Sequence, residues 1–313
     1  MPFTLPTPAP CKECGDGPVF HGITYTSILI DEFVAGLFGA PQGGIAKAPR
    51  ASNNLRMLIE RTIVVPILEL FIFLRLAKRV REPDEDTQLL ALMIWNEAKE
   101  RGIVVEEFRL FGLARNIFMA RLPNGKRIAY EGIPLPRADS ARVPWMDNKE
   151  ILKKEFTKLG LPVARGGAAR SLSGAKKIMS SLTPPVIVKP YSGSGSRHTI
   201  LHIMNEAELT HAFRVATQVA PRAVIEEELT GPVYRATVVA GVFVAALRRD
   251  QPYVVGDGKR TITELVAEAN THPKRQGPYF HHIKLDEAAD QELAWQKLTR
   301  ESVLPIGVRA ILH

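Results

Sequence analysis

The stretch Pro185–His198, PVIVKPYSGSGSRH, decides how the second half of the chain folds. Its β-branched residues are typical of a buried strand, which carries Lys189 to a loop of serines and glycines. Glycines lack a Cβ atom and let backbone N–H groups turn toward an anion, while serine hydroxyls offer further donors. A lysine at the strand end adds a compact positive charge for phosphate oxygens. The stretch therefore predicts a phosphate-binding loop, with a flexible surface turn as the alternative.

Two charged features accompany this loop in the sequence. Lys149 stands at the start of the preceding predicted helix, and the strand AVIEEEL carries Glu226, Glu227 and Glu228 in succession. Because side chains alternate along a strand, at least one of these carboxylates faces the interior. A buried carboxylate needs a partner, and the amino group of an adenine is one candidate donor. The alternative is an exposed acidic edge that deters strand aggregation.

The pattern of elements along the chain predicts an α/β protein with three parts. Residues 1–84 form a tail followed by an apolar helical segment, interpreted as two buried helices that end near residue 81. Residues 85–142 form a small α/β domain, and residues 143–313 alternate short helices and strands. The apolar segment offers a contact surface for a homo-oligomer.

Several local signals mark the turns and helix ends within these parts. In the small domain, a helix over 87–101 stops at Gly102, a strand follows over 103–108, and Asn124-Gly125 predicts a hairpin. In the third part, Ala240-Gly241 predicts another hairpin turn. Thr261 and Glu264 form a Thr-x-x-Glu capping box for a helix over 262–270.

The composition bounds the class of protein. The chain has 313 residues, of which 45% are hydrophobic and 24% charged, and this excludes wholesale disorder. Two cysteines exclude a disulfide scaffold. Charged residues interrupt the most apolar stretch, 58–77, and residues 1–10 lack the features of a signal peptide, so we expect no membrane span and a cytoplasmic location. The net charge of +8 suits ATP or nucleic acid.

The two cysteines have the spacing of a zinc-ligand pair, Cys11-x-x-Cys14. A structural zinc site usually needs four ligands. No second Cys pair follows, and His21 is the only histidine nearby in the sequence. The sequence therefore does not predict a complete metal site at this position.

The order of motifs in the second half resembles that of the ATP-grasp ligases. The segments that carry the resemblance are DNK, GLPVARG, VIVKPYSGSGSRH, VIEEELTGPVYRATVVAG and ALRRDQPYVVGDGKRTITELV. The chain is most similar to the branch containing cyanophycin synthetases and more distantly to D-alanine–D-alanine ligases, from about Trp145 onward. This resemblance implies an α+β fold in which two α+β subdomains clamp ATP. It also implies that the small preceding domain helps to bind the other substrate.

The resemblance assigns roles to particular residues. Two lysines match the pair that holds the ATP phosphates, the glycine-serine loop matches the flap that covers them, and Glu226 matches the residue that receives the adenine amino group. Glu227 and Leu229 match hinge residues whose backbone meets the ring edge. Arg235 and Arg248 resemble the arginines that face the transferring phosphate or acyl-phosphate, with solvated strand charges as the alternative. The residues matched to ATP binding are Lys149, Lys189, Ser192, Gly193, Ser194, Gly195, Ser196, Glu226, Glu227 and Leu229.

The implied reaction joins a small carboxylate to an amine or amino acid, through an acyl-phosphate and with release of ADP. ATP and Mg²⁺ are the implied cofactors. Three departures from the family pattern stand out: Val233 replaces an acidic residue, Arg197 and His198 replace small loop residues, and no asparagine follows Asn270. The residues that bind Mg²⁺ are therefore not identified. We expect the C-terminal end of the ATP-grasp domain, which carries these ligands in the family, to be missing from this chain. The alternatives are a non-catalytic ATP-binding protein and a basic nucleic-acid-binding protein.

Overall fold

The structure, a computed structural model, divides into two compact units, Met1–Leu229 and Thr230–His313. The predicted boundaries at residues 84 and 142 stay predictions. Among the helices of the described residues, none is long and apolar enough to cross a membrane. The structure describes residues 11–14, 20–26, 28–29, 65–85, 87, 89–110, 117–125, 127–131, 148–193, 195–239, 241–276 and 280–312.

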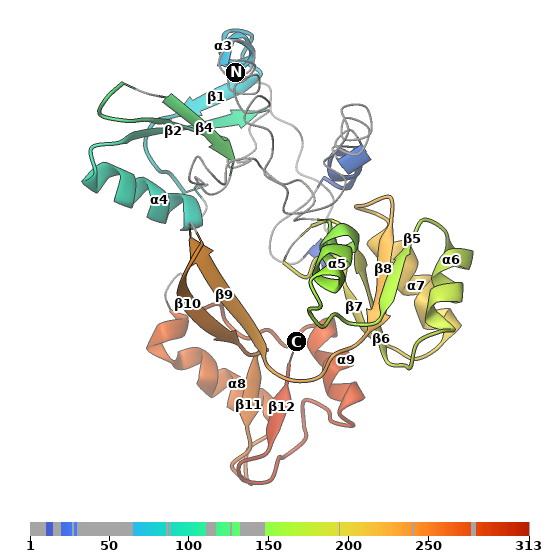
Figure 1. The fold of residues 1–313 in the computed structure, drawn as a ribbon. Coiled ribbons are helices and arrows are strands. Elements are labelled where there is room, and N and C mark those ends of the chain that lie inside the picture. The colour runs from blue at the N-terminus through green and yellow to red at the C-terminus, as the bar shows by residue number, and fades with distance from the viewer. Residues whose placement is uncertain are drawn as a thin grey trace. The chain divides into compact units, whose positions relative to one another are not determined.

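The first sheet of the first unit is antiparallel throughout and has the order β1-β2-β3-β4 (Figure 1). Helix α4 packs on it, and Trp95 meets Phe118 edge to face at a centroid distance of 6.1 Å. The predicted hairpin at Asn124-Gly125 is confirmed, because Gly125 at φ +77° turns the chain between two paired strands. The elements are α3 (Val65–Phe73), β1 (Ala77–Val80), α4 (Leu89–Glu100), β2 (Val104–Leu110), β3 (Ile117–Arg121) and β4 (Arg127–Glu131).

The predicted helical pair ending near residue 81 is wrong at its C-terminal end. Helix α3 spans Val65–Phe73, with Pro66 in its first turn, and β1 occupies Ala77–Val80. Ala77 and Val80 are buried, and the pairing with β2 satisfies the backbone of β1. Arg79 forms an ion pair with Glu69 instead of capping a helix. The first helix of the predicted pair lies outside the described residues.

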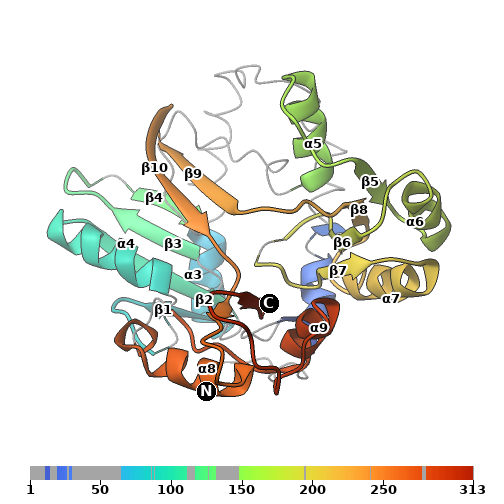
Figure 2. The same ribbon diagram turned by 90° about the horizontal axis from the view of Figure 1, so that it is seen from below.

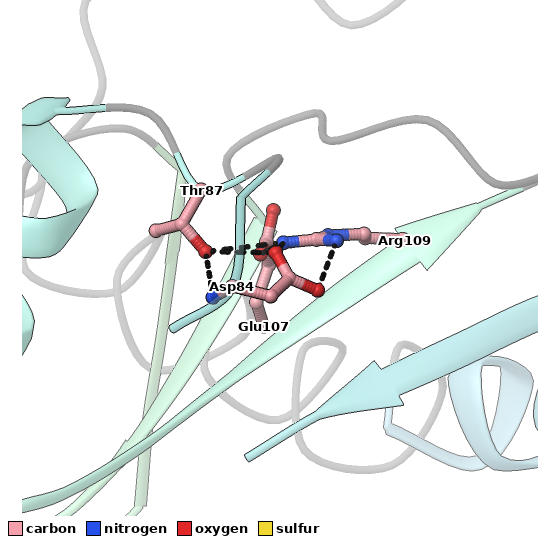
Figure 3. A network of polar contacts seen from close by, with 4 residues as sticks. All are labelled: Asp84, Thr87, Glu107 and Arg109. Atoms are coloured by element: carbon pink, nitrogen blue, oxygen red, sulfur yellow. Dashed lines mark hydrogen bonds and ion pairs between the residues drawn. The ribbon is translucent and has the colours of Figure 1, made fainter. Parts of the chain in front are cut away.

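A buried ion network joins β2 to the turn that follows β1. The Arg109 side chain is 3% exposed and donates to Glu107 at 2.8 Å and to Asp84 at 2.7 and 2.9 Å. Figure 3 shows Asp84, Thr87 and Glu107 gathered around the guanidinium. Burial lowers the pKa of Arg109, but the hydrogen bonds with Asp84 and Glu107 outweigh it and raise that pKa above its ordinary value.

The second sheet of the first unit is also antiparallel, with the order β5-β8-β6-β7. Helices α6 and α7 lie side by side on one of its faces (Figure 2), where Val186, Leu209 and Ile225 form part of one buried core. Helix α5 begins after the Asn148 cap, and its apolar residue Phe156 and the C-cap Leu159 are exposed. The elements are α5 (Lys149–Lys158), β5 (Gly166–Ala169), α6 (Leu172–Met179), β6 (Val186–Pro190), β7 (Ile200–Ile203), α7 (Glu206–Ala216) and β8 (Ala223–Glu227).

The second unit has its own core around Ile262, Leu293 and Leu312. Its first two strands form a hairpin that is exposed along its whole length. The predicted capping box of Thr261 and Glu264 is confirmed at the start of α8. The mixture of helices and antiparallel sheets confirms the predicted α+β class, while the clamp around ATP stays a prediction. The elements are β9 (Val233–Val239), β10 (Val242–Arg249), β11 (Tyr253–Val255), α8 (Ile262–Thr271), α9 (Glu287–Trp295) and β12 (Arg309–Ile311). A short 3₁₀ turn lies at Pro273–Arg275 in this unit, and another lies at Lys12–Cys14 in the first unit.

Candidate functional site

Glu226 on β8 lies between two lysines in the first unit. The register pairs Ile187 with Glu226, so Lys189, two residues further along β6, projects from the same face. Lys189 forms an ion pair with one carboxylate oxygen, and Lys153 of α5 donates to the other at 2.8 Å. The Glu226 side chain is only 13% exposed. Burial raises the pKa of Glu226, but the two lysines outweigh it and hold that pKa below its usual value.

Lys149 ties the start of α5 to the glycine-serine loop. Its backbone N–H donates to the Tyr191 carbonyl at 2.8 Å, and its Nζ donates to the Gly193 carbonyl at 2.7 Å. Gly193 and Gly195 have φ values of +117° and +73°, which favour glycine over any residue with a Cβ atom. Of the two predicted lysines, Lys149 therefore contacts the loop at Gly193, and Lys189 lies on β6, the strand that leads into the loop.

The remaining loop and hinge residues have varied surroundings. Ser192 is half-buried, and Ser196 is exposed, whereas Ser194 lies outside the described residues. Glu227 pairs with Arg165 at 3.1 Å, on the face opposite to Glu226. Leu229, at the end of the first unit, is 74% exposed. Their proposed contacts with an adenine ring stay predictions.

The three consecutive glutamates are half-buried, and each of them has a partner. Beside the pairs of Glu226 and Glu227, Glu228 accepts a hydrogen bond from the backbone N–H of His202 at 2.8 Å. This agrees with the expectation that buried carboxylates on this strand need partners. The alternative of a bare acidic edge does not describe this strand, since β8 lies between β5 and β6.

The two predicted arginines of the second unit lie on opposite faces of the β9–β10 hairpin. Arg235 is opposite Leu247, and Arg248 is opposite Tyr234, so alternation points their side chains in opposite directions. Arg249 shares the face of Arg235 instead. The cause is a register shift between Phe243 and Ala245, because one extra residue there exchanges the two faces of the strand beyond it. Arg248 forms an ion pair with Asp250 at 2.7 Å.

The resemblance assigned Arg248 from the motif ALRRDQP, and this assignment stays a prediction; alternation counted from the turn at residues 240–241 would place Arg248, and not Arg249, on the face of Arg235. No signal in the local sequence marks the bulge. The adjacent pair Arg248-Arg249 was itself the clue that either residue could take the position.

Two carboxylates near the end of the chain, Asp286 and Asp290, have partners within the second unit. Asp286 caps α9 by accepting from the Ala289 N–H at 3.1 Å, and Asp290 pairs with Arg300. Within the described part of the chain, no group of three or more acidic side chains converges on one point. Mg²⁺ at a nucleotide site is usually held by one or two carboxylates together with substrate phosphates, and no residue is assigned to it here.

The lowered pKa of Glu226 predicts a pH-dependent contribution to stability. Its ion pairs stabilise the fold above the ordinary pKa of 4.5 and are lost as the pH falls through the lowered value. We expect Glu226→Gln to reduce the free energy of unfolding by about 1–3 kcal/mol at pH 7. The difference should shrink as the pH falls below about 4.5, because Glu226 then takes up a proton in the unfolded state, and it should vanish below the lowered pKa, where the folded wild-type side chain is also neutral.

Urea unfolding at several pH values measures this effect. The matched control is Glu206→Gln on α7, whose carboxylate pairs with Lys176 but is 67% exposed, and we expect it to change stability by less than about 1 kcal/mol. A Glu226→Gln difference that stays constant between pH 7 and pH 3 would contradict the prediction.

Comparison with known proteins finds several whose sequences are similar to more than half of this chain. No family model matches it. It is 30% identical over 170 residues to a cyanophycin synthetase of Trichormus variabilis, covering 53% of this chain and 19% of that protein. It is 28% identical over 244 residues to the glutathione biosynthesis bifunctional protein GshAB of Streptococcus thermophilus, covering 73% of this chain and 31% of that protein.

A crystal structure of a bifunctional glutathione synthetase from Pasteurella multocida matches 73% of this chain and 30% of its own, with 23% sequence identity and a TM-score of 0.39. The chain thus spans between about a fifth and a third of the length of these curated relatives. The sequence matches confirm the predicted resemblance of this chain to ATP-grasp ligases, and in particular to the cyanophycin synthetases.

Proposed function

We propose that this chain is the ATP-binding part of an ATP-dependent carboxylate–amine ligase that forms an amide or peptide bond. The observation that carries the proposal is the contact of the Lys149 ammonium with the Gly193 carbonyl, in the loop that follows the strand carrying Lys189. Two cations at a glycine-serine loop suit a triphosphate. The sequence similarity to cyanophycin synthetase and to GshAB supports the same conclusion.

In this proposal, the residues of the first unit bind ATP. Lys149, Lys189 and the N–H groups of the loop would hold the phosphates. Glu226 would accept a hydrogen bond from the adenine amino group, since a carboxylate has lone pairs beyond those that two lysines use. The backbones of Glu227 and Leu229 would meet the ring edge.

The reaction itself would proceed in two displacements. An oxygen of the substrate carboxylate attacks the γ-phosphorus, the bond to ADP breaks, and an acyl-phosphate forms. The nitrogen of an amine or amino acid then attacks the acyl carbon, inorganic phosphate leaves, and the nitrogen loses a proton. Positively charged side chains stabilise the charge that develops on oxygen in both steps. Arg235 and Arg248 would supply that charge, with Arg249, which shares the hairpin face of Arg235, as the alternative to Arg248.

Amine-dependent release of ADP tests this proposal. We expect the purified chain to release ADP from ATP only when a carboxylate and an amine are both supplied, with Arg235→Ala lowering the rate about 10²- to 10³-fold. Arg248→Ala and Arg249→Ala should differ, with one lowering the rate similarly and the other much less, because the two arginines project from opposite faces of the hairpin. ATP affinity, measured by calorimetry on the same variants, should change less than about threefold.

A second candidate function is ATP binding without turnover. The engagement of Asp286 at the start of α9 and of Asp290 with Arg300 favours this candidate, because both carboxylates already have partners within the chain. ATP binding by calorimetry with no amine-dependent ADP release would support it and would contradict the ligase proposal. Salt-sensitive oligonucleotide binding that survives Lys189→Ala and Glu226→Ala would instead support the nucleic-acid alternative.

A further inference from the structure

Four side chains with soft or nitrogen donors converge in the first unit, although they come from distant parts of the sequence. Cys11, Cys14 and His21 lie near the N-terminus, and His198 lies at the end of the glycine-serine loop. One ligand atom from each lies within 4.8 Å of all the others. Cys14 and His198 are each 1% exposed, and the other two are half-buried.

The distances suit a tetrahedral ion. Zinc bonds of about 2.3 Å to sulfur and about 2.05 Å to nitrogen place tetrahedral sulfur and nitrogen ligands about 3.6 Å apart. The Cys14 Sγ lies 3.1 Å from the His21 Nε2 and 3.3 Å from the His198 Nε2. The Cys11 Sγ lies 3.9 Å from the His198 Nε2. These separations lie on both sides of the tetrahedral value, so an ion needs only small side-chain adjustments to fit among them.

The surroundings of His198 also match those of a metal ligand. Its Nδ1 lies 3.0 Å from the Val215 carbonyl, which fixes the proton there and leaves the Nε2 lone pair facing the sulfur atoms. Its backbone N–H donates to the Glu13 carbonyl at 2.9 Å, which brings the two chain segments together. His198 has a φ of +54°, a conformation that residues with side chains rarely adopt.

We propose that Cys11, Cys14, His21 and His198 form a closed Cys₂His₂ site for a structural Zn²⁺ ion. Two thiolates and two imidazoles are the donors that Zn²⁺ prefers, and four protein ligands leave no open position for a substrate. The set contains no carboxylate, so it differs chemically from any site for Mg²⁺ bound to ATP.

The site has a consequence for the neighbouring loop. His198 directly follows Arg197 and the exposed Ser196, so the ion would anchor the C-terminal end of the glycine-serine loop to the N-terminal segment. The other end of that loop is already held by Lys149 through Gly193. The inference does not depend on the proposed function, because it concerns how the loop is anchored and not what the loop binds.

Metal analysis of the full chain, purified after expression in zinc-supplemented medium without a polyhistidine tag, tests the proposal. We expect about one zinc ion per chain and, after exchange into Co²⁺, the visible absorption of a tetrahedral thiolate site. His198→Ala and Cys11→Ser should each lose most of the metal. The matched control is His211→Ala, an exposed histidine on α7, which should keep the full content.

Two further measurements keep the proposal falsifiable if His198→Ala fails to fold. Cys11 is less buried than Cys14, so Cys11→Ser should disturb the fold less than a change at Cys14. Thiol titration of the unmodified chain shows whether both cysteines are reduced. Chelator treatment should release zinc and accelerate hydrogen exchange at residues 195–199. A wild-type chain that binds no zinc, a Cys11–Cys14 disulfide, or full metal content in both variants would overturn the proposal.

Discussion

Replacing Lys189 with alanine is expected to weaken ATP binding about 10- to 100-fold. A hydrogen bond to a charged group contributes about 1.5–3 kcal/mol, and the variant loses such bonds to the phosphates. It also leaves Glu226 with Lys153 as its remaining lysine partner, so a carboxylate of the site is less well neutralised. Isothermal titration calorimetry with a non-hydrolysable ATP analogue measures the affinity directly.

Lys177→Ala is the matched control for this prediction. Lys177 lies on α6, is exposed, and belongs to the same unit of the protein. We expect this variant to bind ATP as the wild type does, whereas Glu226→Gln should weaken binding less than Lys189→Ala because the amide oxygen can still accept a hydrogen bond. Equal affinities for Lys189→Ala and the wild type, with both proteins folded by circular dichroism, would reject the assignment of the phosphate site.

Arg109→Ala is expected to reduce the free energy of unfolding by about 3–5 kcal/mol. The substitution leaves the Glu107 carboxylate, whose side chain is 2% exposed, without the guanidinium that neutralises it. It also removes the bidentate contact with Asp84 that joins the turn after β1 to β2. Urea unfolding followed by the fluorescence of Trp95, which packs beside the same sheet, reports the loss.

The control for this prediction is Arg81→Ala, because the two arginines differ mainly in burial. The Arg81 side chain is 72% exposed and pairs with Glu106 at 3.3 Å, so its loss should cost less than about 1 kcal/mol. The double variant Glu107→Leu/Arg109→Met should recover much of the lost stability, since it removes both buried charges together. Similar losses for Arg109→Ala and Arg81→Ala would show that the buried network does not stabilise this sheet.

Much of the local structure could be predicted from the sequence because short-range rules determine it. The Asn124-Gly125 turn, the strand that ends at Lys189 and the capping box at Thr261 all depend on residues a few positions apart. Local signals alone gave a wrong prediction at residues 77–80. There, basic residues after an apolar helix suggested a helix end, but pairing with the distant β2 formed a strand.

In the candidate ATP site, too, local motifs could be predicted from the sequence, whereas contacts between distant segments could not. The order of motifs located Lys149, Lys189 and Glu226, but it did not show that Lys153 joins them, because that contact spans 73 positions of the sequence. Periodicity likewise identified a hairpin containing Arg235 and Arg248. The register shift near Ala245 then placed Arg249 on the face of Arg235, and this depends on hydrogen bonding across the hairpin.

The sequence by itself determined the class of fold and the family that this chain resembles. These properties depend on residue types and on spacings within short segments. Only the tertiary structure brought His198 to Cys11 and Cys14 and buried Arg109 against Glu107. Contacts across long stretches of chain follow from how whole elements pack, and no spacing along the sequence encodes them.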